Sequence, residues 1–393
     1  FYYLVVGCTV LVSTVLLILN RLPVNLVVKG VADNEPRLQL LGFVTQRIKG
    51  VAFAASAAIA ALAGGLFASH QGIVTPTSIG FGLSAELVIL AAIGGRFHVL
   101  GPLVGAVLVG WTSAELRDSF PYWEIVMALG FILVVLKAPG GLSELIERVA
   151  RRFWSPSTSA RADIIKAPPP LAPRVLAPLI FEDVKLQIGV VHILNGIMFE
   201  TPAEGIVSII GPNGAGKTSA VNTITGNLGV SAGQIRLGDT PIENRAPHAA
   251  LSNGIGRKLQ VPSVFFSMTV AENLTLAMLA GRARPRDLFR KSTFGWQSDT
   301  LARVMANPHL SLKDDLAKKA GSLPQGLRQF LEFAMTTASE PTLLLLDEPC
   351  AGLSPDETAV MTQLVQEFQN QCGGLAIIIE HDMSLVEAIS DKV

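Results

Sequence analysis

A lysine and a hydroxyl group follow a run of glycines in the stretch "SIIGPNGAGKTSA" (Ser208–Ala220). The stretch satisfies the pattern G-x-x-x-x-G-K-[ST] and so predicts a phosphate-binding loop between a strand and a helix. Glycines let successive backbone N–H groups curl around an anion, and the helix adds the positive end of its dipole. Lys217 supplies a point charge for phosphate oxygens, and the Thr218 hydroxyl can ligate Mg²⁺. The predicted phosphate site comprises Gly211, Pro212, Asn213, Gly214, Ala215, Gly216, Lys217, Thr218 and Ser219.

Two carboxylates follow a second apolar run, "TLLLLDEP" (Thr342–Pro349). A continuous apolar run is typical of a strand buried on both faces of a parallel sheet, where ligands bind at the carboxyl edge. Asp347 is suited to hold Mg²⁺, and Glu348 is suited to orient or deprotonate an attacking water. Alone, such a pair is more often a solvated strand end, but the phosphate loop favours catalysis. A third run, "LAIIIEHD", places His381 at a strand end, where it can reach a phosphate or act as a structural donor.

The composition places part of the chain outside water. Of 393 residues, 50% are hydrophobic and 16% are charged, against roughly 25% charged residues in soluble domains. The length predicts two or three domains. Zero formal net charge and the lack of a basic patch argue against a nucleic-acid partner. Cys8, Cys350 and Cys372 form no disulfide framework and no metal spacing, which fits a reducing compartment.

Five apolar runs in the first 137 residues predict helices in a lipid bilayer rather than buried soluble helices. The runs are Tyr2–Leu19, Val51–Ser69, Ser84–Gly95, Leu103–Trp111 and Trp123–Leu136.

Loop charges give the expected orientation. The connection after the first run is rich in Lys and Arg and is placed in the cytoplasm, as is the basic stretch from Lys137 to Arg152. The uncharged "HQGIVTPTSIGFG" is placed outside. An even number of crossings must then separate the two cytoplasmic ends. Residues 84–95 and 103–111 are therefore two crossings or one re-entrant pair, and not one long helix. Their glycines either let helices pack closely or mark moving parts.

Composition changes beyond Arg152. The stretch Ser155–Pro178 holds six prolines and few large apolar residues, which predicts a semi-extended tether. We expect a partial transmembrane domain at 1–152, a linker at 153–178 and a nucleotide-binding domain at 179–393. The opening at Phe1 lacks a basic region and a cleavage site, so we do not interpret it as a signal peptide. We expect the sequence to be a piece of a longer chain, with the last domain truncated at its C-terminal end.

From about residue 180 onward, the chain resembles an ATP-binding cassette ATPase of the branched-chain amino acid uptake type. "GPNGAGKT" resembles Walker A, "LLLLDEP" resembles Walker B, and "GRKLQ" resembles the Q-loop that ends at Gln260. "MTVAENL", "AGLSPDE" and "IEHDM" follow in the family's order, the last carrying the switch histidine. The apolar half resembles the C-terminal part of the matching permease through "AFAASAAIAALAGGLFA", "AAIGGRFHVLGPLVGAVLVG" and "ILVVLKAPGGL".

The resemblance implies a helical transmembrane bundle fused to an α/β P-loop cassette with a helical subdomain. It implies ATP and Mg²⁺ as cofactors, with Glu348, His381 and Gln260 in catalysis and Thr218, Gln260 and Asp347 at the metal. Residues 21–50 resemble the segment that seats on the ATPase surface. Implied partners are a second cassette subunit, a second permease subunit, an extracytoplasmic solute-binding protein and the lipid bilayer. The implied activity is ATP-driven import across the cytoplasmic membrane by a multi-pass protein. Branched-chain amino acids come first as solute, and urea or short amides second.

Four positions depart from the family's pattern. The "LSGGQ"-type motif reads "LPQGL" (Leu323–Leu327), so Pro324 replaces a serine and Leu327 a glutamine. Ile188 takes the place of the aromatic residue that stacks on adenine, and Pro36 interrupts an expected helix. Our hypothesis is that this subunit builds one competent ATP site and weakens the other. One alternative is a non-hydrolysing nucleotide-binding membrane subunit. Another is a soluble cassette ATPase, but the apolar runs argue against it.

Overall fold

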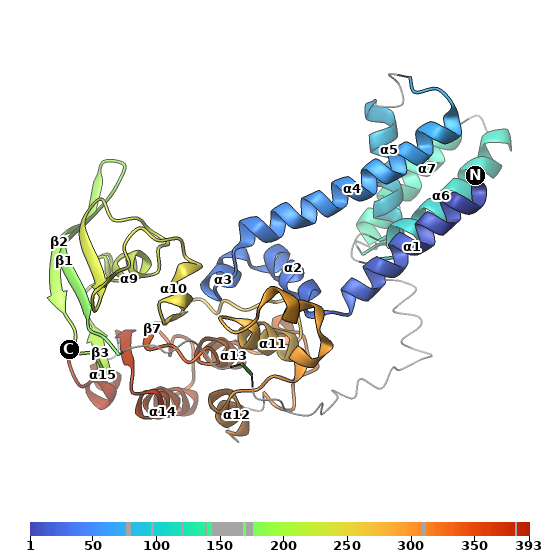
Figure 1. Ribbon diagram of the computed structural model, residues 1–393. Helices are drawn as coiled ribbons and strands as arrows, with labels where there is room; N and C mark the ends of the chain where they lie inside the picture. The colour runs from blue at the N-terminus through green and yellow to red at the C-terminus, as the bar shows by residue number, and fades with distance from the viewer. Residues whose placement is uncertain are drawn as a thin grey trace. The chain divides into compact units, whose positions relative to one another are not determined.

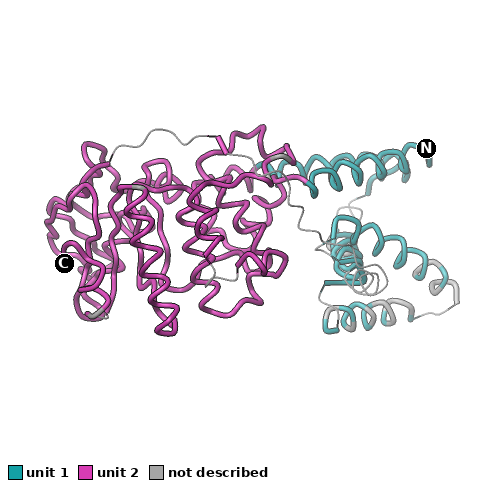
Figure 2. The backbone as a smooth tube through the Cα atoms, turned by 90° about the horizontal axis from the view of Figure 1, so that it is seen from below, with its two compact units in different colours: residues 1–21, 51–159 teal, residues 22–50, 160–393 magenta. Residues whose placement is uncertain are grey.

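The computed structural model describes residues 1–75, 80–95, 98–119, 122–137, 140–143, 168–169, 176–307, 312–381 and 383–393. The chain divides into two compact units (Figure 2). The helical unit comprises Phe1–Arg21 and Val51–Ser159, and the cassette unit comprises Leu22–Gly50 and Ala160–Val393. The expected boundary at 152 and most of the expected linker at 153–178 lie outside the described residues.

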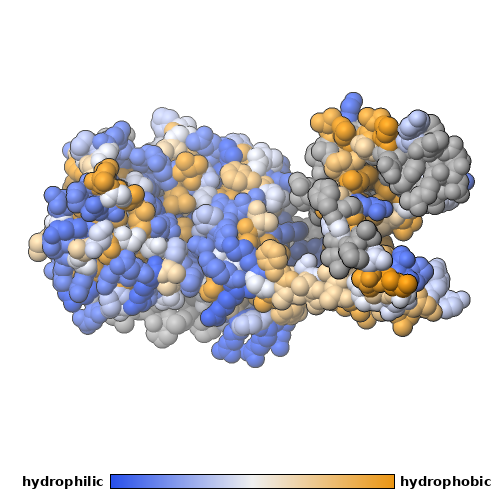
Figure 3. Space-filling model, turned by 90° about the horizontal axis from the view of Figure 1, so that it is seen from above, coloured by the Kyte–Doolittle hydropathy of each residue, from blue (hydrophilic) through white to orange (hydrophobic). Residues whose placement is uncertain are grey.

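Each apolar run of the first half lies in a helix. The helices are α1 (Tyr2–Asn20), α4 (Thr45–Gln71), α5 (Phe81–Gly94), α6 (Gly101–Ser119) and α7 (Trp123–Lys137). Among the described residues, α1 with 19 residues and α4 with 27 are long and apolar enough to cross a membrane. Large apolar side chains such as Tyr3 and Phe53 are exposed, and hydrophobic surface dominates the described part of the helical unit (Figure 3).

The glycine-rich break separates α5 from α6, which confirms that residues 84–111 do not form one long helix. The two helices pack backbone against backbone. A Cβ added at Gly94 would overlap the carbonyl of Gly101, and one at Gly105 would overlap the carbonyl of Leu90. This contact supports the packing role expected for these glycines. Whether α5 and α6 form two crossings or a re-entrant pair stays a prediction.

Two four-stranded sheets form the core of the cassette unit. The parallel sheet has the order β3-β8-β7-β6, and the antiparallel sheet the order β2-β1-β4-β5. The parallel strands are β3 (Gly205–Ile209), β6 (Ile255–Lys258), β7 (Leu343–Asp347) and β8 (Leu375–Ile379). The antiparallel strands are β1 (Leu179–Ile188), β2 (Val191–Glu200), β4 (Ala232–Leu237) and β5 (Thr240–Pro241).

The strand β7 is buried on both faces, as its continuous apolar sequence predicts. Leu343 and Leu345 lie in the core that faces β1 and the helix α9 (Lys217–Ile224). Leu344 and Leu346 lie in a second core with the helices of the subdomain. The alternation follows from the two-residue period of a strand. It fixes the carboxyl end of β7 between two rigid cores.

Helices of 3 to 18 residues make up the rest of the cassette unit and include the expected helical subdomain (Figure 1). The α-helices are α2 (Pro23–Asp33), α3 (Glu35–Leu40), α10 (Ala249–Ser252), α11 (Val270–Leu279), α12 (Asp299–Ala306), α13 (Gln325–Thr337), α14 (Pro355–Cys372) and α15 (Met383–Ile389). The 3₁₀ helices are η2 (Pro285–Phe289), η3 (Lys291–Gly295) and η4 (Ala320–Ser322).

The segment Leu22–Gly50 belongs to the cassette unit, in agreement with the expected seating of residues 21–50 on the ATPase. The expected interruption takes a specific form. Asn34 ends α2 and caps α3 by accepting a hydrogen bond from the Arg37 amide at 3.1 Å. Pro36 occupies the first turn of α3, where its missing N–H needs no partner. The helix is therefore interrupted at Asn34, and Pro36 lies in the first turn of the helix that follows.

Candidate functional site

The phosphate loop runs from β3 to Lys217, the first residue of α9. Gly216 caps α9 with φ 87°, in the left-handed region where a side chain is strained. A Cβ at Gly216 would lie 2.9 Å from Leu194 Cδ2 and 3.2 Å from the Ile193 carbonyl. Both the backbone conformation and the close approach of β2 therefore require glycine at this position.

The Lys217 ammonium lies over the loop. It donates hydrogen bonds to the carbonyls of Gly211 at 2.7 Å and Pro212 at 2.9 Å. The neighbouring Thr218 side chain points toward the carboxyl end of β7, where its Oγ1 lies 3.5 Å from Asp347 Oδ1. The structure thus brings Lys217, Thr218 and Asp347 together. Direct phosphate roles for Asn213, Ala215 and Ser219 stay predictions.

Asp347 ends β7 and is only 1% exposed. Burial raises the pKa of its carboxyl above the usual value, and the nearby Arg257 works in the opposite direction. Arg257 Nη2 lies 3.7 Å from Asp347 Oδ2. Burial lowers the pKa of Arg257 to about 10, so this guanidinium stays charged at neutral pH. Arg257 also donates to Asn222 Oδ1 at 2.7 Å and Thr225 Oγ1 at 2.9 Å.

Glu348 is held between the two other predicted catalytic residues. Gln260 Nε2 donates to Glu348 Oε2 at 2.8 Å, and His381 Nε2 lies 2.9 Å from Glu348 Oε1. The backbone of Glu348 has φ 45°, an uncommon conformation for a residue with a side chain. Its amide donates to the Ile379 carbonyl at the end of β8. Local backbone strain of this kind clusters at functional sites.

Thr218 and Asp347 suit Mg²⁺. This ion typically takes one or two carboxylates from a protein and fills its other positions with water and phosphate oxygens. Within the described residues, no group of three or more His, Cys, Asp or Glu side chains forms an all-protein metal site. A buried carboxylate beside a hydroxyl at the mouth of a phosphate loop fits a shared Mg²⁺–phosphate site instead. The Gln260 amide nitrogen is bonded to Glu348, and its metal role stays a prediction.

The "LPQGL" stretch lies at the start of α13. Pro324 is the N-cap residue and provides no side-chain cap, so the helix begins without the hydroxyl that a serine would supply. Leu327 packs against the large core of the cassette unit. Ile188 ends β1 and is 49% exposed, with no ring to offer an adenine base. Pro324, Leu327 and Ile188 therefore each change the local chemistry relative to the family's pattern.

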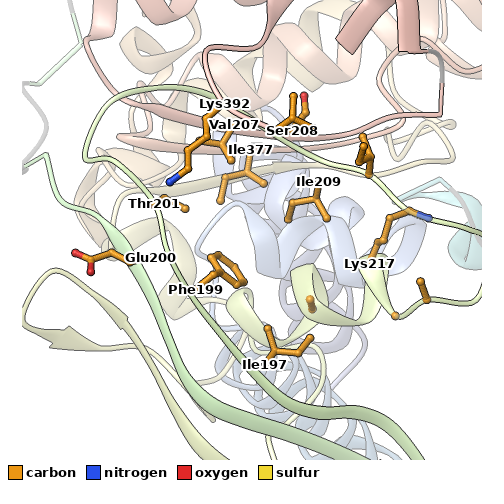
Figure 4. Close-up of a pocket in the computed structure, with 15 residues that line it drawn as sticks. Ile197, Phe199, Glu200, Thr201, Val207, Ser208, Ile209, Lys217, Ile377 and Lys392 are labelled. Carbon is orange, nitrogen blue, oxygen red and sulfur yellow. The ribbon is translucent and has the colours of Figure 1, made fainter. Parts of the chain in front are cut away.

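A pocket of 410 Å³ lies between β2, β3 and α9 (Figure 4). Apolar side chains such as Ile197, Phe199 and Ile377 line it, and Lys217 lies at one edge. The carboxylates Asp347 and Glu348 are not among the lining residues. The pocket is therefore separate from the predicted catalytic groups.

Sequence reasoning missed four charged residues behind the site. Arg257 pairs with Asp347, and the buried Glu332 pairs with Arg37 at 3.5 Å. Glu380 accepts a hydrogen bond from the Cys350 amide at 3.2 Å, and burial raises the pKa of its carboxyl. One signal was present in the sequence: "IGRK" in β6 places two cations inside a strand between buried elements, where charge is rare unless it is paired.

Comparison with known proteins gives the same two parts. A family profile described as ABC transporter matches residues 194–351, and one described as branched-chain amino acid transport system / permease component matches residues 4–136.

The chain is 34% identical over 217 residues to the high-affinity branched-chain amino acid transport ATP-binding protein LivG of Escherichia coli K12. The aligned residues cover 53% of this chain and 83% of LivG. The chain is 33% identical over 218 residues to the corresponding protein BraF of Pseudomonas aeruginosa, with the same two shares.

A solved nucleotide-free ATP-binding cassette from an ABC transporter aligns with a TM-score of 0.46 and 27% identity, over 55% of this chain and 85% of the other. The relatives and the profiles agree with the motifs. The chain belongs to the ATP-binding cassette transporter family of the branched-chain amino acid transport type, and it carries a permease domain N-terminal to its ATP-binding cassette.

Proposed function

We propose that this chain hydrolyses ATP to drive solute import, with branched-chain amino acids as the solute. The observation that carries the proposal is the position of Glu348. Its carboxylate is held by Gln260 at 2.8 Å and His381 at 2.9 Å, directly after the buried Asp347. Relatives named as branched-chain amino acid transport ATP-binding proteins support the choice of solute.

The residues divide the work of phosphoryl transfer to water. Lys217 and the loop amides bind the triphosphate, and Thr218 and Asp347 hold Mg²⁺. The ion, when bound, neutralises charge on the phosphate oxygens. Glu348 orients the attacking water and accepts its proton. Gln260 and His381 fix the Glu348 carboxylate, so that little rearrangement is needed at the moment of reaction.

We further propose that the protein is a multi-pass component of the cytoplasmic membrane with its cassette in the cytoplasm. A second cassette subunit, a second permease subunit and an extracytoplasmic solute-binding protein would complete the transporter. The apolar helices α1 and α4 and the match of residues 4–136 to a permease profile support this placement. Urea or short amides are the alternative solutes.

Uptake by the complete transporter in proteoliposomes tests the proposal. With ATP inside and radiolabelled leucine, urea or acetamide outside with the binding protein, we expect ATP-dependent accumulation of leucine. Accumulation of an amide alone would correct the solute and keep the mechanism. ATP hydrolysis that is absent from the assembled wild-type complex would refute the mechanism.

A second proposal concerns asymmetry between two ATP sites. Pro324 and Leu327 remove two hydrogen-bond donors from the motif that faces a partner's nucleotide, while the chain's own Lys217, Asp347 and Glu348 are intact. We infer that this subunit contributes catalytic residues to one site and a weak surface to the other. Vanadate trapping would then label one site per complex. Equal labelling of both sites would contradict this asymmetry.

A further inference from the structure

One cation links the segment Leu22–Gly50 to the interior of the cassette. The segment is held mainly by apolar contact, because side chains of α2 and α3 join the core of the helical subdomain. The residues that share this core are Leu26, Val27, Leu38, Leu41, Val264, Phe265 and Met268. Polar contacts at the rim add to the apolar ones. Asp33 accepts from Ser267 at 2.9 and 3.0 Å, and Asn34 donates to Ser263 at 3.0 Å.

Arg37 passes through this interface and is 1% exposed. Its Nη1 donates to the Arg257 carbonyl at 2.8 Å, and its Nη2 donates to Thr336 Oγ1 at 2.9 Å and the Glu332 carbonyl at 3.3 Å. Nη1 is also 3.5 Å from the Glu332 carboxylate. Burial lowers the pKa of Arg37, but an arginine keeps its charge at physiological pH. The guanidinium therefore joins α3 to both β6 and α13.

Two of the residues that Arg37 contacts, Arg257 and Glu332, connect onward toward the nucleotide site. Arg257 accepts from Arg37 with its carbonyl and directs its own guanidinium to Asp347 at 3.7 Å. Glu332 Oε1 also accepts from the Leu259 amide at 3.0 Å. Leu259 precedes Gln260, whose amide holds Glu348.

A buried guanidinium is a costly way to attach the segment, which points to a further role for Arg37. Taking a guanidinium out of water costs several kcal/mol, and an apolar side chain of similar volume is often as stable in such a place. The surrounding apolar contacts and the Asp33 and Asn34 hydrogen bonds already attach α2 and α3. The Arg37 guanidinium adds a hydrogen bond to the backbone of β6 and an ion pair with Glu332, whose carboxylate accepts from the Leu259 amide.

We propose that Arg37 is a positioning residue that transmits displacement of α3 to β6 and so to Gln260 and Asp347. The proposal rests on the proposed function, because it names how the permease segment would regulate that same site. When α3 moves, the Arg257 carbonyl and the Glu332 carboxylate move with it. The Glu348 carboxylate and the Mg²⁺ ligand Asp347 then lose or regain their catalytic positions.

Arg37→Met tests the proposal, because methionine keeps most of the volume and removes the fork. In the complete transporter, solute and binding protein should stimulate ATP hydrolysis. We expect this stimulation to fall about 10-fold in Arg37→Met, a change of the size that is typical for coupling between two sites. Hydrolysis without solute should change far less. Arg37→Lys keeps the charge but not the planar fork, and should recover part of the stimulation. Arg47→Met is the matched control, since Arg47 is exposed in the same segment.

A double-mutant cycle separates transmission from attachment. Thr336→Val removes the hydroxyl that accepts from Arg37 and leaves the shape of α13 unchanged. If the two residues act through one connection, the loss in Arg37→Met/Thr336→Val should equal the loss in Arg37→Met alone. Additive losses, or solute stimulation that survives Arg37→Met unchanged, would overturn the proposal.

Hydrogen exchange supplies a readout that does not depend on transport. In the purified wild-type chain, the amides of β6 and Leu259 should be protected by the Arg37 and Glu332 contacts. Arg37→Met should speed exchange of the 255–260 peptide about 10-fold, whereas Arg47→Met should not. Unchanged exchange would refute the proposal even if the wild-type transporter works. Faster exchange together with an inactive wild-type transporter would refute the proposed function alone.

Discussion

At the scale of one residue, the buried carboxylate of Asp347 lowers the stability of the folded protein when it is ionised. Its carboxylate is 1% exposed, and burial raises the pKa of the group despite the neighbouring Arg257. The folded protein therefore binds a proton at this carboxylate more readily than the unfolded chain. The ionised form, which the proposed Mg²⁺ site requires, is the form that burial destabilises.

Asp347→Asn is therefore expected to raise the unfolding midpoint of the nucleotide-free cassette near pH 7. The variant resembles the protonated form, which the fold prefers. As the pH falls through the raised folded pKa toward 3.8, wild-type Asp347 takes up its proton and the difference between the two proteins should shrink. Thermal unfolding in detergent at several pH values measures the effect. A wild-type midpoint above that of the variant at pH 7 would contradict it.

Glu348 is expected to be essential for turnover but not for binding. Glu348→Gln keeps the size and the contacts with Gln260 and His381 but removes the proton acceptor. ATP hydrolysis by the assembled complex should fall about 10²- to 10⁴-fold, the usual range for a general base. Filter binding should show Mg-ATP still retained. Glu204→Gln, at an exposed carboxylate, is the matched control. Hydrolysis that persists in Glu348→Gln would show that another group accepts the proton.

At the scale of elements, local pattern predicted the positions of the strands that carry the site. The run "LLLLD" predicted a strand buried on both faces, and its alternating leucines lie in two cores. The apolar runs predicted five helices, because helix formation in apolar segments depends on local composition. The partner of Arg37 could not be predicted, since Thr336 lies 299 residues away and only the tertiary fold brings them together. The helix interruption expected at Pro36 lies two residues earlier, at Asn34, because the Asn34 side chain caps the second helix there.

The "LPQGL" motif at the start of α13 can be tested by restoring the serine of the family's pattern. Pro324→Ser restores a hydroxyl at the N-cap position, where serine stabilises a helix by about 1 kcal/mol relative to residues without a cap. We expect a higher unfolding midpoint and faster ATP hydrolysis by the assembled complex, because the site completed by this motif regains a donor. Pro202→Ser, in an exposed loop, controls for the loss of a proline. Unchanged hydrolysis would show that Pro324 does not limit the weaker site.

At the scale of the whole molecule, chain order and compact units do not coincide. Residues 22–50 lie between two membrane-type helices in sequence, yet they belong to the cassette unit. Leu38 is fully buried there, and the Arg37 guanidinium contacts Arg257, Glu332 and Thr336 in the cassette interior. The fusion is therefore held by folding as well as by the peptide chain.

This arrangement predicts that the polypeptide linker is dispensable for attachment. A protease site inserted between Ser159 and Ala160 would separate the chain into a membrane fragment and a cassette fragment. We expect both fragments to co-elute in mild detergent after cleavage, because α2 and α3 carry a buried apolar surface into the cassette core. Leu38→Asp should release the cassette, since it places an unpaired carboxylate at a fully buried position. A cassette fragment that elutes alone without this substitution would show that the linker itself holds the two parts together.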